Sequence, residues 1–145
     1  MSDIKARQDA IVDELSAISD WRERYRRIIR IGRDMPEMPE ADRDDDHLVK
    51  GCQSRVWLHA DLEGDRVRFR GFSDTSIVNG LVAMLIRVFD DSTPADILAA
   101  DGSFLDRIGI HENLSQNRAN GLAAMIKQIK AYGIGYQHLL SMQGR

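Results

Sequence analysis

The N-terminal quarter of the chain alternates apolar and charged residues at the spacing of two amphipathic helices. The first helix is predicted from about residue 3 to 18, and the second begins at the capping-box-like pair Asp20 and Glu23. Gly32 is expected to end the second helix, because the prolines of the 35–39 segment cannot continue it. The apolar stripes of the two helices are Ile4, Ile11, Leu15 and Ile18, then Trp21, Tyr25, Ile28 and Ile29.

Between residues 56 and 70 the apolar period changes to two, which is typical of β-strands. The turn pattern Glu63-Gly64-Asp65 divides this stretch into the two arms of a hairpin with one apolar face. We expect residues 47–49 to add a short third strand. The apolar positions that alternate are Val56, Leu58, Ala60 and Leu62, then Val67 and Phe69.

The rest of the chain returns to helical spacing. A helix from about Thr75 to Phe89 is apolar around most of its circumference, with Ser73 or Asp74 expected as its cap, and should lie in the middle of the domain. Short helices are predicted after Thr93-Pro94 and after Ser103, and a long one from near Ser115 to about Gly133. The sequence therefore predicts one α+β domain over residues 1–145, with a small antiparallel sheet of two or three strands packed against several helices.

Composition agrees with a globular cytoplasmic protein. The chain has 145 residues, 43% of them hydrophobic and 30% charged, with a net charge of -3. Its N-terminus lacks the pattern of a signal peptide, and its longest uncharged stretch, residues 75–86, is shorter than the roughly 18 residues of a spanning helix. We expect no association with membranes.

The chain has one cysteine, Cys52. One cysteine excludes an intrachain disulfide, a CxxC pair and a four-cysteine metal or cluster site. Gly51 allows a tight turn before it, which predicts a thiol at the tip of a loop. Lys50, Arg55 and His47 are expected to place positive charge near the sulfur, which would lower the thiol pKa and favour the nucleophilic thiolate. The alternative is a small buried hydrophobic side chain.

The segment Val49-Lys50-Gly51-Cys52-Gln53-Ser54-Arg55-Val56-Trp57-Leu58 resembles the signature of the SufE family, whose members accept sulfur from cysteine desulfurases. Three further blocks resemble the family in the same order: residues 21–39, residues 73–81, and the R-x-x-G-L stretch within residues 114–122. The chain departs from the family pattern at His47, where the family usually has Asn, and at Arg55, where it usually has Gln.

The resemblance implies a SufE/NifU-like fold and a role for Cys52 as a persulfide-forming thiol. It implies that the chain takes sulfur from a pyridoxal-phosphate cysteine desulfurase, activates that enzyme, and delivers the sulfur for iron–sulfur cluster assembly on a scaffold. The chain would then be a carrier rather than an independent enzyme, without a cofactor or metal of its own. The residues expected to support Cys52 or bind the partner are Arg118, Asp74, Gly51, Lys50, Arg55 and His47.

Two other functions stay open at the level of sequence. A nucleic-acid- or protein-binding module could use the arginine-rich second helix, on which Arg22, Arg26, Arg30 and Arg33 share one face. The negative net charge disfavours nucleic acid, so we expect none as a partner. A thiol hydrolase would need an oriented base, and His47 and His59 are expected to be ordinary surface histidines. The acidic run Asp42, Asp44, Asp45 and Asp46 lacks the glycine and late glutamate of an EF-hand and is expected to be a solvated loop.

Overall fold

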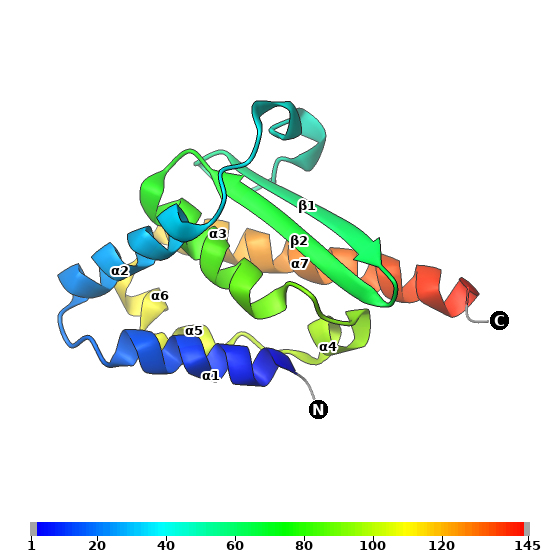
Figure 1. Cartoon of the computed structure of the whole chain (residues 1–145). Coiled ribbons are helices and arrows are strands. Elements are labelled where there is room, and N and C mark those ends of the chain that lie inside the picture. The colour runs from blue at the N-terminus through cyan, green and yellow to red at the C-terminus, as the bar shows by residue number, and fades with distance from the viewer. Residues whose placement is uncertain (1–2, 144–145) are drawn as a thin grey trace.

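The computed structural model describes residues 3–143. The helices are α1 (Asp3–Ser16), α2 (Trp21–Asp34), α3 (Ser76–Phe89), α4 (Pro94–Ala99), α5 (Ser103–Ile108), α6 (Ile110–Asn113) and α7 (Gln116–Gln143). The strands are β1 (Val56–Glu63) and β2 (Arg66–Ser73), preceded by the 3-10 turns η1 (Glu40–Asp42) and η2 (Asp45–His47). The predicted α+β class is confirmed, and the helices lie on one side of a hairpin, with α7 running alongside it (Figure 1).

The two strands pair antiparallel, from Val56 opposite Ser73 to Glu63 opposite Arg66. The expected third strand is reduced to one bridge between Leu48 and Trp57. This prediction was wrong in extent, because only Val49 N donates to β1, to Val56 O at 2.8 Å, before the chain turns away into the loop of Cys52.

Other segments of the chain cover both outer edges of this small sheet. On the β1 edge, the hydroxyls of Tyr132 and Tyr136 of α7 donate to Leu58 O and Ala60 O at 3.1 and 2.8 Å. On the β2 edge, Val67 N donates to Ser92 O at 2.8 Å and Phe69 N to the Asp90 carboxylate at 2.8 Å. An uncovered edge would offer unpaired backbone groups to other chains, and these contacts pair several of them within the protein.

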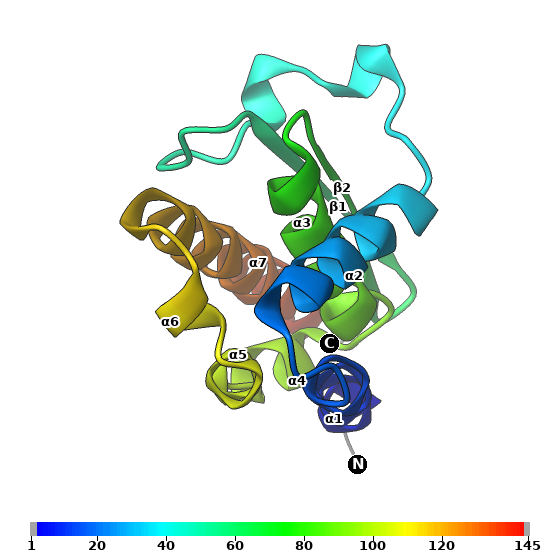
Figure 2. The ribbon, with the colours of Figure 1, turned by 90° about the vertical axis from the view of Figure 1, so that its left-hand side faces the viewer.

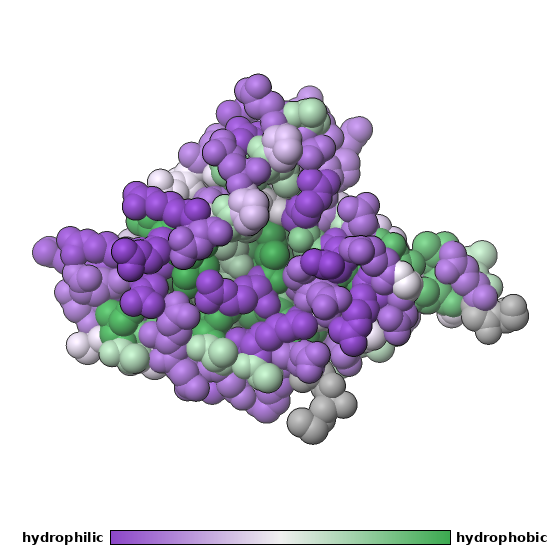
Figure 3. Space-filling view, viewed as in Figure 1, coloured by the Kyte–Doolittle hydropathy of each residue, from purple (hydrophilic) through white to green (hydrophobic). Residues whose placement is uncertain are grey.

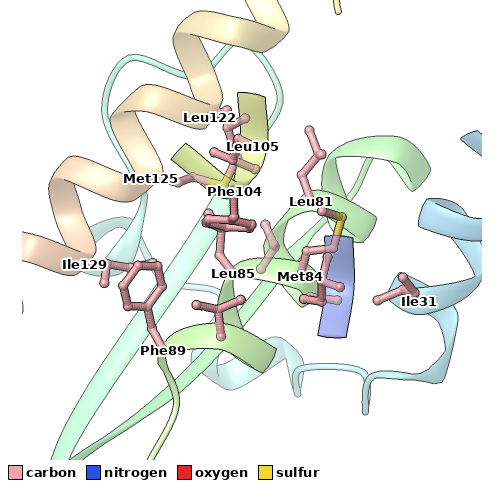
Figure 4. Packing of buried hydrophobic residues seen from close by; sticks show 14 of the residues in the cluster. Ile31, Leu81, Met84, Leu85, Phe89, Phe104, Leu105, Leu122, Met125 and Ile129 are labelled. Atoms are coloured by element: carbon pink, nitrogen blue, oxygen red, sulfur yellow. The ribbon is translucent and has the colours of Figure 1, made fainter. Parts of the chain in front are cut away.

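Helix α3 lies at the centre of the core, as its apolar circumference predicts. Leu81, Met84 and Leu85 are at most 2% exposed. Side chains of α5 and α7 meet those of α3 in one apolar cluster, while Ile31 of α2 approaches from the other side (Figure 4). The cluster positions the N-terminal turns of α3 and α7, which border the loop of Cys52.

Two glycines predicted to end helices lie inside them. Gly32 is in α2 where it crosses α3, and a Cβ there would lie 2.8 Å from the backbone nitrogen of Gly80. Gly133 is in α7 against α4, and a Cβ there would lie 3.1 Å from Ile97. Both predictions were wrong, because each glycine allows close packing rather than a turn.

The predicted caps have mixed outcomes. The Thr93 hydroxyl accepts from Asp96 N, as expected for the start of α4. Helix α3 instead begins after Thr75 with no side-chain cap, since the Ser73 hydroxyl donates to Arg55 O at 2.9 Å and Asp74 pairs with Arg55. Gly102, rather than Ser103, holds the position before α5.

The surface is mainly polar, with an apolar region on the last turns of α7, which project from the body (Figure 3). Ile134, Leu139 and Met142 are its large exposed side chains. Among residues 3–143, no helix is long and apolar enough to cross a membrane.

Candidate functional site

Cys52 lies in the loop that joins the Leu48 bridge to the start of β1. Gly51 has a φ of +96°, a left-handed conformation that favours glycine and turns the chain sharply before the cysteine. After the loop, the chain is fixed again at Val56, which is 1% exposed. The tight turn expected at Gly51 is therefore present and directs the Cys52 side chain toward α7.

The thiol of Cys52 is partly buried against the first turns of α7. It donates to the backbone oxygen of Gly121 at 3.5 Å, a distance within the range of a sulfur hydrogen bond. Burial raises the pKa of the Cys52 thiol. The expectation that nearby cations would lower this pKa was wrong, because removal of the sulfur from water is the dominant effect at this position.

A cavity of about 350 Å³ opens beside the sulfur, between the Cys52 loop, α3 and α7. Arg118 lines it from the first turn of α7, and its guanidinium has no ion pair or hydrogen bond with the rest of residues 3–143. The cavity therefore combines a thiol, this unpaired cation, and walls of both polar and apolar side chains. Its lining residues are Cys52, Gln53, Ser54, Val78, Leu81, Ser115, Asn117, Arg118, Gly121 and Met125.

The other predicted site residues lie outside this cavity lining. Arg55 donates to the Asp74 carboxylate at 3.0 Å, and its guanidinium lies over the Trp57 ring at 5.3 Å. Lys50 is exposed at the start of the turn. His47 instead contacts Asp44 and stacks on His59. Of the cations predicted for the site, Arg118 is thus the one that the structure places at the cavity.

Two features of the structure, one at this site and one outside it, were missed by the sequence interpretation. Gly121 faces the sulfur so closely that a Cβ there would lie 3.4 Å from Cys52 Sγ. Its position in the apolar stripe of α7, one residue before Leu122, was the available indication. His59 was expected at the surface but is 9% exposed, and its ring stacks on His47 with centroids 3.6 Å apart. The cause is the 36–49 segment, which folds over the outer face of β1 (Figure 2).

The arginine series of α2 is partly used within the protein. Arg24 donates to Ile108 O at 3.0 Å and also to Ile18 O. Arg26 pairs with Glu23, and Arg27 lies 3.6 Å from the Glu14 carboxylate. These contacts neutralise or enclose half of the six arginines between residues 22 and 33, and reduce the charge left for an external polyanion.

The fold and the site define a small α+β protein whose one thiol, beside a cavity, is its candidate reactive group. The model of the SufE family, described as an Fe-S metabolism associated domain, matches residues 9–133. The chain therefore belongs to the SufE family.

Relatives and a solved structure agree with this assignment. The chain is 41% identical over 132 residues to an uncharacterized SufE-like protein of Rhizobium meliloti, covering 88% of this chain and 94% of the relative. It is 39% identical over 127 residues to one of Rhizobium etli, with 84% and 86% covered. It is similar to the solution structure of a hypothetical protein from Thermus thermophilus, with a TM-score of 0.75, 19% identity, and 91% and 96% of the two chains covered. That likeness supports the fold alone.

Proposed function

We propose that Cys52 accepts sulfur from the persulfide of a pyridoxal-phosphate cysteine desulfurase and passes it on for iron–sulfur cluster assembly. The observation that carries the proposal is the placement of the chain's one thiol beside a cavity that Arg118 also lines. Membership of a family linked to Fe–S metabolism supports the pathway. The chain acts as a carrier and as an activator of the desulfurase rather than as an independent enzyme.

The transfer needs one sulfur from each protein. The Cys52 thiolate attacks the outer sulfur of the desulfurase persulfide, a new S–S bond forms on Cys52, and the original S–S bond breaks. The desulfurase cysteine leaves as a thiolate, so no external oxidant or reductant is consumed. Removal of the sulfur frees that cysteine for another turnover, which explains activation without a second catalytic group on this chain.

The cavity suits the product of this step. The outer sulfur of a persulfide extends about 2 Å beyond Sγ, and the adjoining space of about 350 Å³ accommodates it. Arg118 lines the same space and would stabilise the anion of the thiol or persulfide. Burial raises the pKa of the Cys52 thiol in the isolated protein. We propose that contact with the desulfurase favours the thiolate.

The exposed residues around the loop are proposed to meet the partner proteins. Lys50, Arg55 and Asp74 are exposed, and the Arg55–Asp74 ion pair joins the end of the Cys52 loop to the segment before α3. They would contact the desulfurase first and the cluster scaffold afterwards. Gly51 would act by allowing the loop to turn, and His47 by fixing the segment before it.

The direct test mixes the protein with a cysteine desulfurase and free cysteine. Intact-mass and peptide analysis should find one added sulfur atom on Cys52, and sulfide release should become faster. Cys52→Ala should show neither effect. Stimulation by Cys52→Ala equal to that of the wild type, together with no label on Cys52, would contradict the proposal.

Two further variants separate the cavity from the rest of the surface. Arg118→Ala should slow sulfur acceptance, whereas Arg33→Ala, an exposed arginine of α2, should not. Gly121→Ala should fold, since the nearest atoms to the new methyl group are those of Cys52 at 3.4 Å or more, but should accept less sulfur because that group occupies space beside Sγ. Unchanged labelling of Gly121→Ala and Arg118→Ala would show that the cavity has no part in the transfer.

A further inference from the structure

A second group of side chains with metal-binding chemistry lies outside the cavity of Cys52. Asp44, His47 and His59 each offer one ligand atom, and these three atoms lie within 4.8 Å of one another. Two of the residues come from the loop over the sheet and one from β1. Nothing in the proposed sulfur transfer uses them as a group.

The local fold holds each of the three in place. Asp44 precedes η2, where its carboxylate accepts from His47 N at 3.0 Å and contacts His47 Nδ1 at 2.6 Å. The His47 ring stacks on His59 at an interplanar angle of 12°. His59 Nε2 lies 2.6 Å from Asp42 O. The side chains are therefore oriented by contacts with the backbone and with one another.

Their chemistry selects among metal ions. Two imidazoles and a carboxylate form a donor set that suits zinc and neighbouring divalent transition metals, whereas calcium and magnesium prefer oxygen ligands alone. The ligand atoms of a tetrahedral zinc ion lie roughly 3.3 Å apart, given zinc–ligand distances of about 2.0 Å. The three candidate ligand atoms lie within 4.8 Å of one another, so a bound ion would draw the side chains closer together.

The position is open to ions from solution. The side chains of His47 and Asp44 are 34% and 42% exposed, while His59 forms the inner wall. The backbone oxygen of Asp42 lies beside His59 and supports its ring.

We propose that Asp44, His47 and His59 bind a divalent transition metal ion of the zinc class. The ion would connect the loop before Cys52 to β1, across the outer face of the sheet. It would act on the position of that loop, since His47 is five residues before Cys52. This site goes beyond the proposed sulfur transfer and does not depend on it.

The test measures zinc binding by full-length Cys52→Ser protein, a background that removes the thiol as a ligand. Competition with a chromogenic chelator should give one equivalent of bound zinc. His47→Asn and Asp44→Asn should each weaken binding at least tenfold. The matched controls His111→Asn and Asp46→Asn, which change exposed residues of the same types outside the cluster, should bind as the parent does.

Cobalt provides a spectroscopic readout that does not depend on sulfur transfer. Its d–d absorption should be intense, as for a four-coordinate site of nitrogen and oxygen ligands, and should be lost in His47→Asn. The test rests on His47 and Asp44 rather than on the buried His59, because substitutions at these two partly exposed positions leave the core intact. Binding unaffected by His47→Asn and Asp44→Asn, or no binding of zinc by the parent protein, would overturn the proposal and leave a structural histidine pair.

Discussion

The reactivity of Cys52 depends on how easily its sulfur loses a proton. The thiol donates to Gly121 O and is partly buried, and burial raises the pKa of this thiol. Arg55, three residues further on, is paired with Asp74 and so is not available to the sulfur. The partly buried sulfur therefore ionises less readily than a fully exposed thiol.

The first prediction concerns alkylation of Cys52 by iodoacetamide as a function of pH. Because the pKa is raised in the folded protein, the thiolate forms at higher pH than in the unfolded chain, and the midpoint of the rate profile should shift upward. Near neutral pH the thiolate fraction falls roughly tenfold for each unit of pKa increase, so native alkylation should be slower. Arg55→Ala should leave the profile unchanged. A native midpoint below that of the urea-unfolded protein would contradict this account.

At the scale of single residues, the sequence predicted the reactive residue and its local backbone better than the side-chain contacts around it. Cys52 and the turn at Gly51 depend on residue type and local backbone, and both were found from the chain. The direction of Arg55 depends on Asp74, which follows the partner strand β2 and is 19 residues away in the chain, so proximity in sequence led to the wrong electrostatics. The contact of His47 with His59 likewise requires the loop to fold over β1, which no local pattern encodes.

At the scale of elements, the most informative positions are the glycines at helix crossings. A glycine in an apolar stripe can end a helix or let another helix approach closely. The spacing of Gly32 and Gly133 does not distinguish these two roles. The structure places Gly32 and Gly80 at the contact of α2 with α3, where a Cβ on Gly80 would lie 2.2 Å from Ile28 O. The Asn79 side chain also links α3 to α2 at this crossing, since it donates a hydrogen bond to Gly32 O at 3.2 Å.

The second prediction compares two Gly-to-Ala substitutions within helices. Gly80→Ala should lower the free energy of unfolding by roughly 2–3 kcal/mol, because the methyl group meets rigid backbone and forces α2 from α3. Gly135→Ala in α7 has no atom within 4 Å of its new methyl group and should raise stability by about 0.8 kcal/mol through helix propensity. Urea unfolding measures both. Equal effects of the two substitutions would show that the crossing is not close-packed in solution.

At the scale of the whole molecule, the periodicity of the sequence predicted the order of helices and strands. It did not predict the contacts that cover the edges of the sheet. The hairpin was predicted with its turn, since Glu63-Gly64-Asp65 separates two alternating stretches. The coverage of its edges comes from Tyr132 and Tyr136, which lie 74 and 76 residues along the chain from their acceptors, and from the segment after α3. Long-range contacts of this kind depend on the completed fold, so local spacing does not predict them.

The last prediction tests whether those edge contacts also hold the cavity of Cys52 in shape. Helix α7 carries Arg118 and Gly121 near its start and the two tyrosines further along, so its docking on β1 positions both. The double variant Tyr132→Phe and Tyr136→Phe leaves two strand carbonyls without donors and should lower the free energy of unfolding by about 2 kcal/mol, at about 1 kcal/mol for each hydrogen bond. Movement of α7 should also open the cavity and speed alkylation of Cys52.

Tyr25→Phe loses a hydroxyl contact to Asn113 O at 2.9 Å, away from the sheet, and should reduce stability without changing the alkylation rate. If the double variant loses stability but its Cys52 reacts at the wild-type rate, the tyrosines close the sheet edge only, and the cavity is held by the apolar contacts of α7 with α3.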